Sequence, residues 1–169
     1  KQKILIEYPS PNTNKSLHIG HMRNILLGNS LINILEETKN KVIKTNLYND
    51  RGIAICKAML GYDLYFKDKT PESENLKGDE FMSNCYVKFE AESKKDEPLL
   101  TKAQELLVKW ENNHEETRLL WEKVLAWVYD GYAVTFHNLK QRMQELVANR
   151  GKMEDIDFDD HIKNPFNMY

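Results

Sequence analysis

The chain has few cysteines and no long apolar segment. The first absence argues against a disulfide-rich or thiolate metal protein, and the second against a membrane-spanning one. The two cysteines, Cys56 and Cys85, are far apart and form no Cys-x-x-Cys pair. The sequence therefore predicts neither a disulfide framework nor a thiolate metal site, and we expect reduced thiols in a cytoplasmic protein. No apolar run approaches the length of a membrane-spanning helix, so we expect no membrane contact.

An excess of charge of one sign is also lacking. The 169 residues include 24 Lys and Arg against 26 Asp and Glu, which gives a formal net charge of −2 at pH 7. No overall positive field attracts nucleic acid, and any contact with RNA would have to be local. The length allows one domain, or a domain with an appended helical piece.

Three common motifs of nucleotide-binding proteins and hydrolases are missing as well. The sequence has no glycine-rich Walker loop, no Gly-x-Gly-x-x-Gly and no Gly-x-Ser-x-Gly. This excludes the usual kinase, NTPase, dinucleotide and serine hydrolase sites.

What the chain does contain is a short apolar strand that leads through a turn into a long helix. Residues 3–8 include Ile4, Leu5 and Ile6 and suit a strand buried on both faces. Two prolines end this strand, and from residue 17 apolar residues recur at helical spacing until residue 39. A β-branched run at 41–48 predicts a second strand, parallel to the first in one βαβ unit.

The rest of the sequence is mainly helical in pattern. We expect helices at 53–66, 99–110 and 119–147, the last stopped by Gly151, an exposed loop at 68–79, a short helix or turn followed by an extended piece at 81–89, and a charged connector at 91–97. Trp110, Trp121 and Trp127 fall at helical core positions and are interpreted as packing residues.

Two histidines at the start of the first helix predict a phosphate-binding site. His18 and His21 are three residues apart, so both rings can reach an anion that the free amides and the helix dipole attract. Each ring can donate a hydrogen bond to a phosphate oxygen, most strongly in a transition state. Gly20 lets the ligand approach the backbone, and Lys15 adds a positive charge for a polyphosphate.

Glu7 and Asn12 predict a second, positively charged substrate. Glu7 ends the first strand, and ligands of parallel sheets bind beyond the carboxyl ends of the strands. Asn12 in the turn can donate to or accept from a polar group of the substrate. The segment 49–52 follows the second strand at the same edge.

Metal sites are the main competing interpretation. A His-x-x-His pair can bind zinc, but the other histidines and the cysteines are scattered and supply no third ligand at a suitable spacing. The acidic run 154–160 lacks the spacing of a calcium loop and is interpreted as solvated. We therefore expect no protein-bound metal.

The residues from Ser10 to Asn24 read Ser-Pro-Asn-Thr-Asn-Lys-Ser-Leu-His-Ile-Gly-His-Met-Arg-Asn. Their His-Ile-Gly-His segment resembles the HIGH signature of class I aminoacyl-tRNA synthetases, and the flanking residues resemble the arginyl-tRNA synthetase version. The segments 49–53, 70–73, 77–79 and 128–132 are also similar to that family. The likeness covers residues 4–139.

The resemblance implies an α/β fold with a Rossmann-like parallel sheet and a helical insertion, and a ligase that activates arginine with ATP and transfers it to tRNA(Arg). It implies that His18 and His21 contact the ATP phosphates and that Lys15 helps to hold ATP. It also implies that Asn12 contacts the substrate arginine and that Glu7 faces its guanidinium group. Mg²⁺ would arrive with ATP without protein ligands, and we expect a monomer.

The sequence also departs from this family. After Leu139 the family pattern is lost, and Lys152-Met153-Glu154-Asp155 shares only its first two letters with a KMSKS loop. We therefore expect a truncated N-terminal part of the catalytic domain, inactive or nearly so alone. It would comprise a nucleotide-binding half at 1–66, a helical insertion at 67–139 and an unassigned tail at 140–169.

Two alternatives stay open. A synthetase-derived binding or regulatory module would keep the fold without ligation chemistry. A related nucleotidyltransferase could carry the same histidine signature, but the arginyl-type flanking residues would then be a coincidence.

Overall fold

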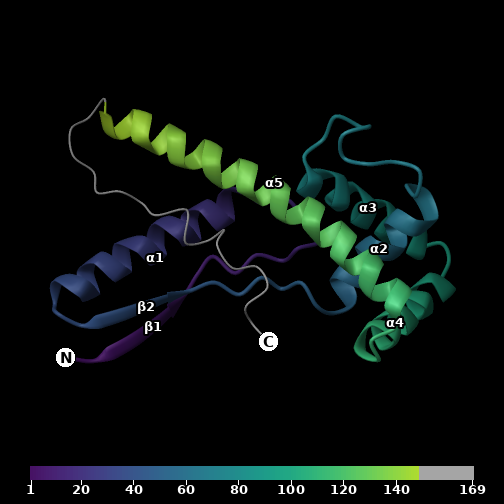
Figure 1. Ribbon diagram of the computed structural model, residues 1–169, viewed down its shortest axis with the longest axis horizontal. Helices are drawn as coiled ribbons and strands as arrows, with labels where there is room; N and C mark the ends of the chain where they lie inside the picture. The colour runs from purple at the N-terminus through teal and green to yellow at the C-terminus, as the bar shows by residue number, and fades with distance from the viewer. Residues whose placement is uncertain (149–169) are drawn as a thin grey trace. The chain divides into compact units, whose positions relative to one another are not determined.

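The computed structural model describes residues 1–148, which form strands and helices in the order that Figure 1 shows. The elements are β1 (Lys3–Glu7), α1 (Ile19–Glu37), β2 (Lys41–Thr45), α2 (Ile53–Tyr65), α3 (Gly78–Ser93), α4 (Pro98–Glu111) and α5 (Glu115–Ala148). The predicted helix end at Gly151, the KMSKS comparison at 152–155 and the acidic run 154–160 lie outside the described residues.

The described residues divide into two compact units. Unit 1 contains residues 1–11, 17–48 and the described residues from 135 on, and unit 2 contains residues 12–16 and 49–134. Helix α5 therefore begins in unit 2 and ends in unit 1. The predicted domain boundaries stay a prediction.

Unit 1 contains the predicted βαβ unit. Strands β1 and β2 pair in parallel with Lys3 opposite Lys41 and Glu7 opposite Thr45, and α1 forms the crossover between them. The α/β class with a parallel sheet is confirmed. The prediction that β1 is buried on both faces was wrong, because Leu5 is 63% exposed. A run of three apolar residues does not reveal how many layers cover a sheet.

Helix α1 lies close to the end of β1 at one glycine. A Cβ atom on Gly28 would come within 2.5 Å of ring carbons of Tyr8, so only glycine lets the Tyr8 ring lie there. The Tyr8 hydroxyl donates to Asn29 Oδ1 at 2.9 Å. Ile25 and Ile32 are buried on the same helix, but Leu31 and Ile34 of the predicted apolar pattern are exposed.

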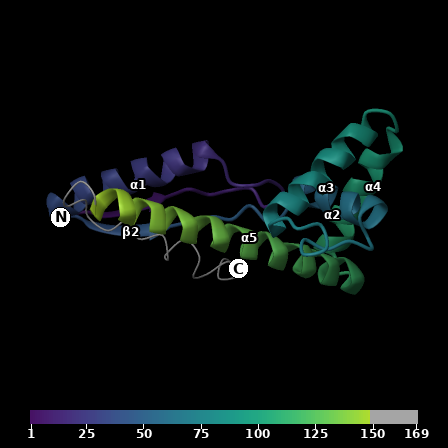
Figure 2. The same cartoon turned by 90° about the horizontal axis from the view of Figure 1, so that it is seen from above.

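Unit 2 is helical, and Figure 2 shows α2, α3 and α4 side by side. Its core includes an edge-to-face cluster in which Trp127 lies 5.4 Å from Tyr62 and 5.6 Å from Phe81 between ring centroids. Trp110 and Trp121 form another such pair at 5.2 Å. The prediction that the three tryptophans are packing residues is confirmed.

Helix α3 corrects the prediction for 81–97. The structure has one helix from Gly78 to Ser93 in place of a short helix, an extended piece and a connector that begins at 91. Its buried Phe81, Cys85 and Phe89 are four residues apart, which is a helical spacing. The residues between them include Ser83, Asn84 and Val87, which have modest helix propensity and left the pattern ambiguous.

The helices predicted at 53–66, 99–110 and 119–147 are confirmed as α2, α4 and α5, within a few residues at each end. None of the helices within residues 1–148 has both the length and the apolar character of a membrane span.

Candidate active site

His18 and His21 cap the start of α1 by a reciprocal pair of hydrogen bonds. His18 is the N-cap residue with extended backbone (φ −137°, ψ 176°). Its Nδ1 accepts a hydrogen bond from the Gly20 amide at 3.1 Å, and its own amide donates to His21 Nδ1 at 3.0 Å. This is a capping box built from two imidazoles in place of the more usual Ser or Thr with Glu.

The cap determines which tautomer each histidine adopts. A neutral imidazole that accepts a hydrogen bond at Nδ1 carries its proton on Nε2. Both rings therefore have an Nε2–H group as the donor for a ligand, and their centroids are 4.0 Å apart. The first turn of α1 contains no acidic residue that would repel an anion. These features fit a phosphate group.

Burial lowers the pKa of His21 below its usual value. The neighbouring His18 lowers this pKa further. His21 therefore stays neutral to a lower pH than an exposed histidine would.

Gly20 has a structural role in addition to the predicted one, which was to let a ligand approach the backbone. A Cβ atom at this position would lie 2.8 Å from Cε1 and 3.0 Å from Nδ1 of His18. The glycine thus makes room for the His18 ring. The sequence predicted a ligand, not this ring, in the space beside Gly20.

An apolar pocket lies beside the two histidines within unit 1. It has a volume of about 230 Å³, and its lining includes Met22 from α1 and Phe136 and Leu139 from α5, together with His18 and His21. Such an apolar surface suits the flat apolar part of a ligand.

Glu7 lines a different pocket of unit 1. This pocket has a volume of about 400 Å³ and also includes Ser10 from the turn and Asn24 from α1. The Ser10 hydroxyl donates to Glu7 Oε1 at 2.7 Å, and the Ser10 amide donates to Asn46 Oδ1 at 3.0 Å. Glu7 is thus an exposed carboxylate that lines a cavity and is oriented by one hydrogen bond, an arrangement that suits a cationic ligand.

Asn12 and Lys15 belong to unit 2. Both are exposed, whereas Thr13 and Asn14 between them are buried. Asn12 Oδ1 accepts a hydrogen bond from Asn49 Nδ2 at 2.7 Å. The Lys15 ammonium lies 5.7 Å from the centre of the Tyr86 ring.

Sequence reasoning missed several residues that these sites use. Ser10 and Asn24 carry no motif of their own beyond the resemblance. Asn49 is distinguished in the sequence only by its place after the second strand and by the segment 49–53 that resembles the family. Tyr132 contacts the 12–15 loop from more than a hundred residues away along the chain, and no local signal could have identified that contact.

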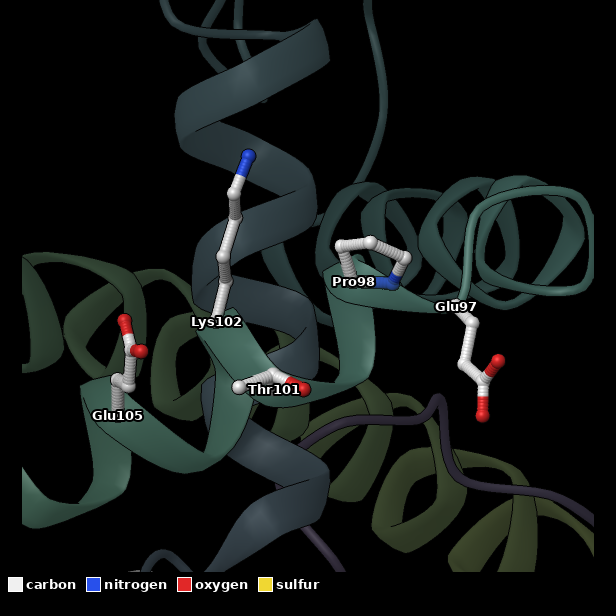
Figure 3. Close-up of a pocket in the computed structure, with 5 residues that line it drawn as sticks. All are labelled: Glu97, Pro98, Thr101, Lys102 and Glu105. Atoms are coloured by element: carbon white, nitrogen blue, oxygen red, sulfur yellow. The ribbon is translucent and has the colours of Figure 1, made fainter.

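The larger pocket in Figure 3 contains none of the predicted residues. Its volume is about 470 Å³, and it lies along one stretch of helix α4, from Glu97 and Pro98 to Lys102 and Glu105. Among residues 1–148, no three His, Cys, Asp or Glu side chains are grouped as metal ligands. The absence of a protein-bound metal stays a prediction.

A parallel βαβ unit with two imidazoles at its first helix start is typical of α/β proteins that bind anions beyond the carboxyl ends of their strands. The family described as "tRNA synthetases class I (R), catalytic domain" matches residues 1–161, and the chain belongs to this family.

Three relatives illustrate the similarity. The arginine–tRNA ligase of Bacteroides fragilis is 46% identical over 153 residues, which cover 80% of this chain and 26% of that protein. The ligase of Amoebophilus asiaticus is 44% identical over 156 residues, covering 82% and 26%. That of Borrelia hermsii is 44% identical over 135 residues, covering 80% and 23%. The chain thus spans about a quarter of the length of these relatives.

Proposed function

We propose that this chain forms part of an arginine–tRNA ligase, in which it binds ATP and arginine for the synthesis of arginyl-tRNA(Arg). The observation that carries the proposal is the histidine cap, which directs both Nδ1 atoms to the backbone and keeps both Nε2–H groups as donors. Family membership supports the choice of ATP as the anion.

The two imidazoles and the helix start would act on the phosphates during activation. In that step an oxygen of the arginine carboxylate attacks the α-phosphorus, the bond from this phosphorus to the bridging oxygen breaks, and pyrophosphate leaves. Negative charge builds up on the phosphate oxygens, and preorganised N–H donors stabilise it. Because each ring can donate through its Nε2–H, neither need release or take up a proton in this step.

The role of Lys15 in ATP binding stays a prediction. It rests on the position of this residue three residues before His18. Its exposed ammonium group is compatible with this role. Glu7 is proposed to bind the guanidinium group of arginine, because its carboxylate lines a pocket and is oriented by Ser10. Asn12 is proposed as a further arginine contact.

Several finer points remain predictions. These are Mg²⁺ bound with ATP, the monomeric state, contact with tRNA(Arg) and the cytoplasmic location.

Isothermal titration calorimetry with ATP tests the phosphate site. We expect His18→Ala and Lys15→Ala each to weaken ATP binding by about tenfold or more, because each removes a hydrogen bond to a charged group. His137→Ala, at an exposed histidine of α5, is the matched control and should bind ATP like the parent chain. Unchanged affinity in both site variants would contradict the phosphate assignment.

The arginine site is tested by Glu7→Gln in the same titrations. Glutamine keeps the shape of the side chain but removes its charge, so arginine affinity should fall by about tenfold or more while ATP affinity stays the same. If arginine still binds to this variant, Glu7 does not hold the guanidinium group.

A further inference from the structure

Helix α5 contacts the loop of residues 12–15 through one buried hydroxyl group. Tyr132 is 1% exposed, and its hydroxyl oxygen lies 2.8 Å from the carbonyl oxygens of both Asn12 and Lys15. One hydroxyl proton is thus shared between the first and the last residue of the loop. The Lys15 amide also donates to the Asn12 carbonyl, at 3.4 Å.

The two residues that accept from Tyr132 are also the exposed ones of the loop. The carbonyl groups of Asn12 and Lys15 accept hydrogen bonds from the Tyr132 hydroxyl, and the side chains of both residues are exposed. Thr13 and Asn14 are 0% and 2% exposed. The two exposed residues are those assigned above to arginine and to ATP.

The same helix also holds the neighbouring loop. Trp121 Nε1 donates to the Asp50 carbonyl at 2.7 Å, and the Tyr129 hydroxyl donates to Asp50 Oδ2 at 2.9 Å. The preceding carbonyl, of Asn49, accepts hydrogen bonds from the amide and the hydroxyl of Thr13, at 3.3 and 3.1 Å. Helix α5 therefore supports the 12–15 loop both directly and through residues 49–50.

We propose that Tyr132 is a positioning residue for substrate binding, which holds the 12–15 loop so that Lys15 and Asn12 are preorganised for their ligands. The proposal rests on the function proposed above for these two residues. A loop that is already ordered loses less conformational entropy when a ligand binds, so the loop binds that ligand more tightly. Tyr132 itself touches no substrate in this account.

Hydrogen exchange tests the positioning step without any ligand. In Tyr132→Phe the buried ring remains and the hydroxyl is lost, so we expect the amides of Thr13 and Lys15 to exchange about tenfold faster, in line with the loss of one buried hydrogen bond. Amides in α2 and α3 should exchange as before. Tyr62→Phe is the matched control, because it removes a buried tyrosine hydroxyl of the same unit that donates to the Lys67 carbonyl at 2.9 Å.

ATP titration then tests the effect on binding. We expect the dissociation constant of Tyr132→Phe for ATP to rise by about fivefold, a change that one hydrogen bond can produce, and that of Tyr62→Phe to stay within about twofold of the parent chain. Melting temperatures show whether a variant loses stability as a whole. We expect the melting temperatures of Tyr132→Phe and Tyr62→Phe to fall equally, so that a difference in ATP binding reports the local effect at the loop.

The outcomes separate this inference from the proposed function. Faster exchange in the loop together with weaker ATP binding supports both. Faster exchange in Tyr132→Phe in a chain that binds no ATP overturns the ATP assignment and the binding part of the inference. Unchanged exchange at Thr13 and Lys15, or equal loss of ATP affinity in the two variants, overturns Tyr132 as a positioning residue even where the parent chain binds ATP.

Discussion

His18 and His21 use the Nδ1 atom of each ring to begin helix α1, which leaves each Nε2–H as a donor. In an ordinary capping box a hydroxyl and a carboxylate satisfy the free amides, and the carboxylate would repel a phosphate. Imidazole accepts at Nδ1 without a negative charge and donates at Nε2. The distances of 3.1 and 3.0 Å at the two Nδ1 atoms thus explain why histidine suits both positions.

The lowered pKa of His21 predicts a pH-dependent loss of stability. An unfolded histidine takes up a proton near pH 6.5, whereas His21 in the folded chain resists it because of burial and the nearby His18. The unfolded state then binds more protons, so the free energy of unfolding falls as the pH decreases from about 6.5 to the lowered pKa and levels off below it.

His21→Gln isolates this effect. Glutamine can accept the same hydrogen bond from the His18 amide but does not titrate. Thermal unfolding followed between pH 8 and pH 5 should therefore show a smaller decrease in stability for this variant than for the parent chain. Parallel curves for the two proteins would show that His21 has an ordinary pKa.

Helices α3 and α5 approach each other at two glycines. A Cβ atom on Gly78 would overlap the Trp127 carbonyl group, and one on Gly131 would overlap the Asp79 carboxylate. Gly78 and Gly131 both lie in segments that resemble the synthetase family, and this packing gives a physical reason for a glycine in each. Asp79 is buried there, with Lys77 Nζ 3.5 Å from its Oδ1.

Gly78→Ala should be strongly destabilising. Backbone atoms of Trp127 cannot rotate away as a side chain can, so we expect the free energy of unfolding in urea to fall by at least about 2 kcal/mol. Asn84→Ala, at an exposed position of the same helix, should change it by no more than about 0.5 kcal/mol. A similar small change in Gly78→Ala would mean that the helices can separate at little cost.

The elements show which features the sequence can predict. The β1–α1–β2 unit and helices α2, α4 and α5 follow from local periodicity and turn residues, and these predictions were correct. The exposure of Leu5 depends on how many layers cover the sheet, which no run of three residues reports. Helix α3 was missed because residues of modest helix propensity, such as Ser83, Asn84 and Val87, lie between its buried positions.

At the scale of the whole molecule, the sequence predicted local features better than contacts between distant segments. The motif around His18 and His21 is local, so its position at a helix start could be predicted. The pockets beside Glu7 and beside the histidines, and the contact from Tyr132 to the 12–15 loop, join segments far apart in sequence. Such contacts depend on tertiary packing and were not predictable from spacing.

The measurement that tests the central claim most directly is a map of backbone amide chemical shifts over the whole chain during titration with ATP. We predict that the largest shifts fall at residues 15–22, with smaller ones at 135–139 beside the apolar pocket. Residues 97–105, which line the larger pocket on α4, should not shift. Shifts concentrated at 97–105, or none at His18 and His21 at saturating ATP, would contradict the account.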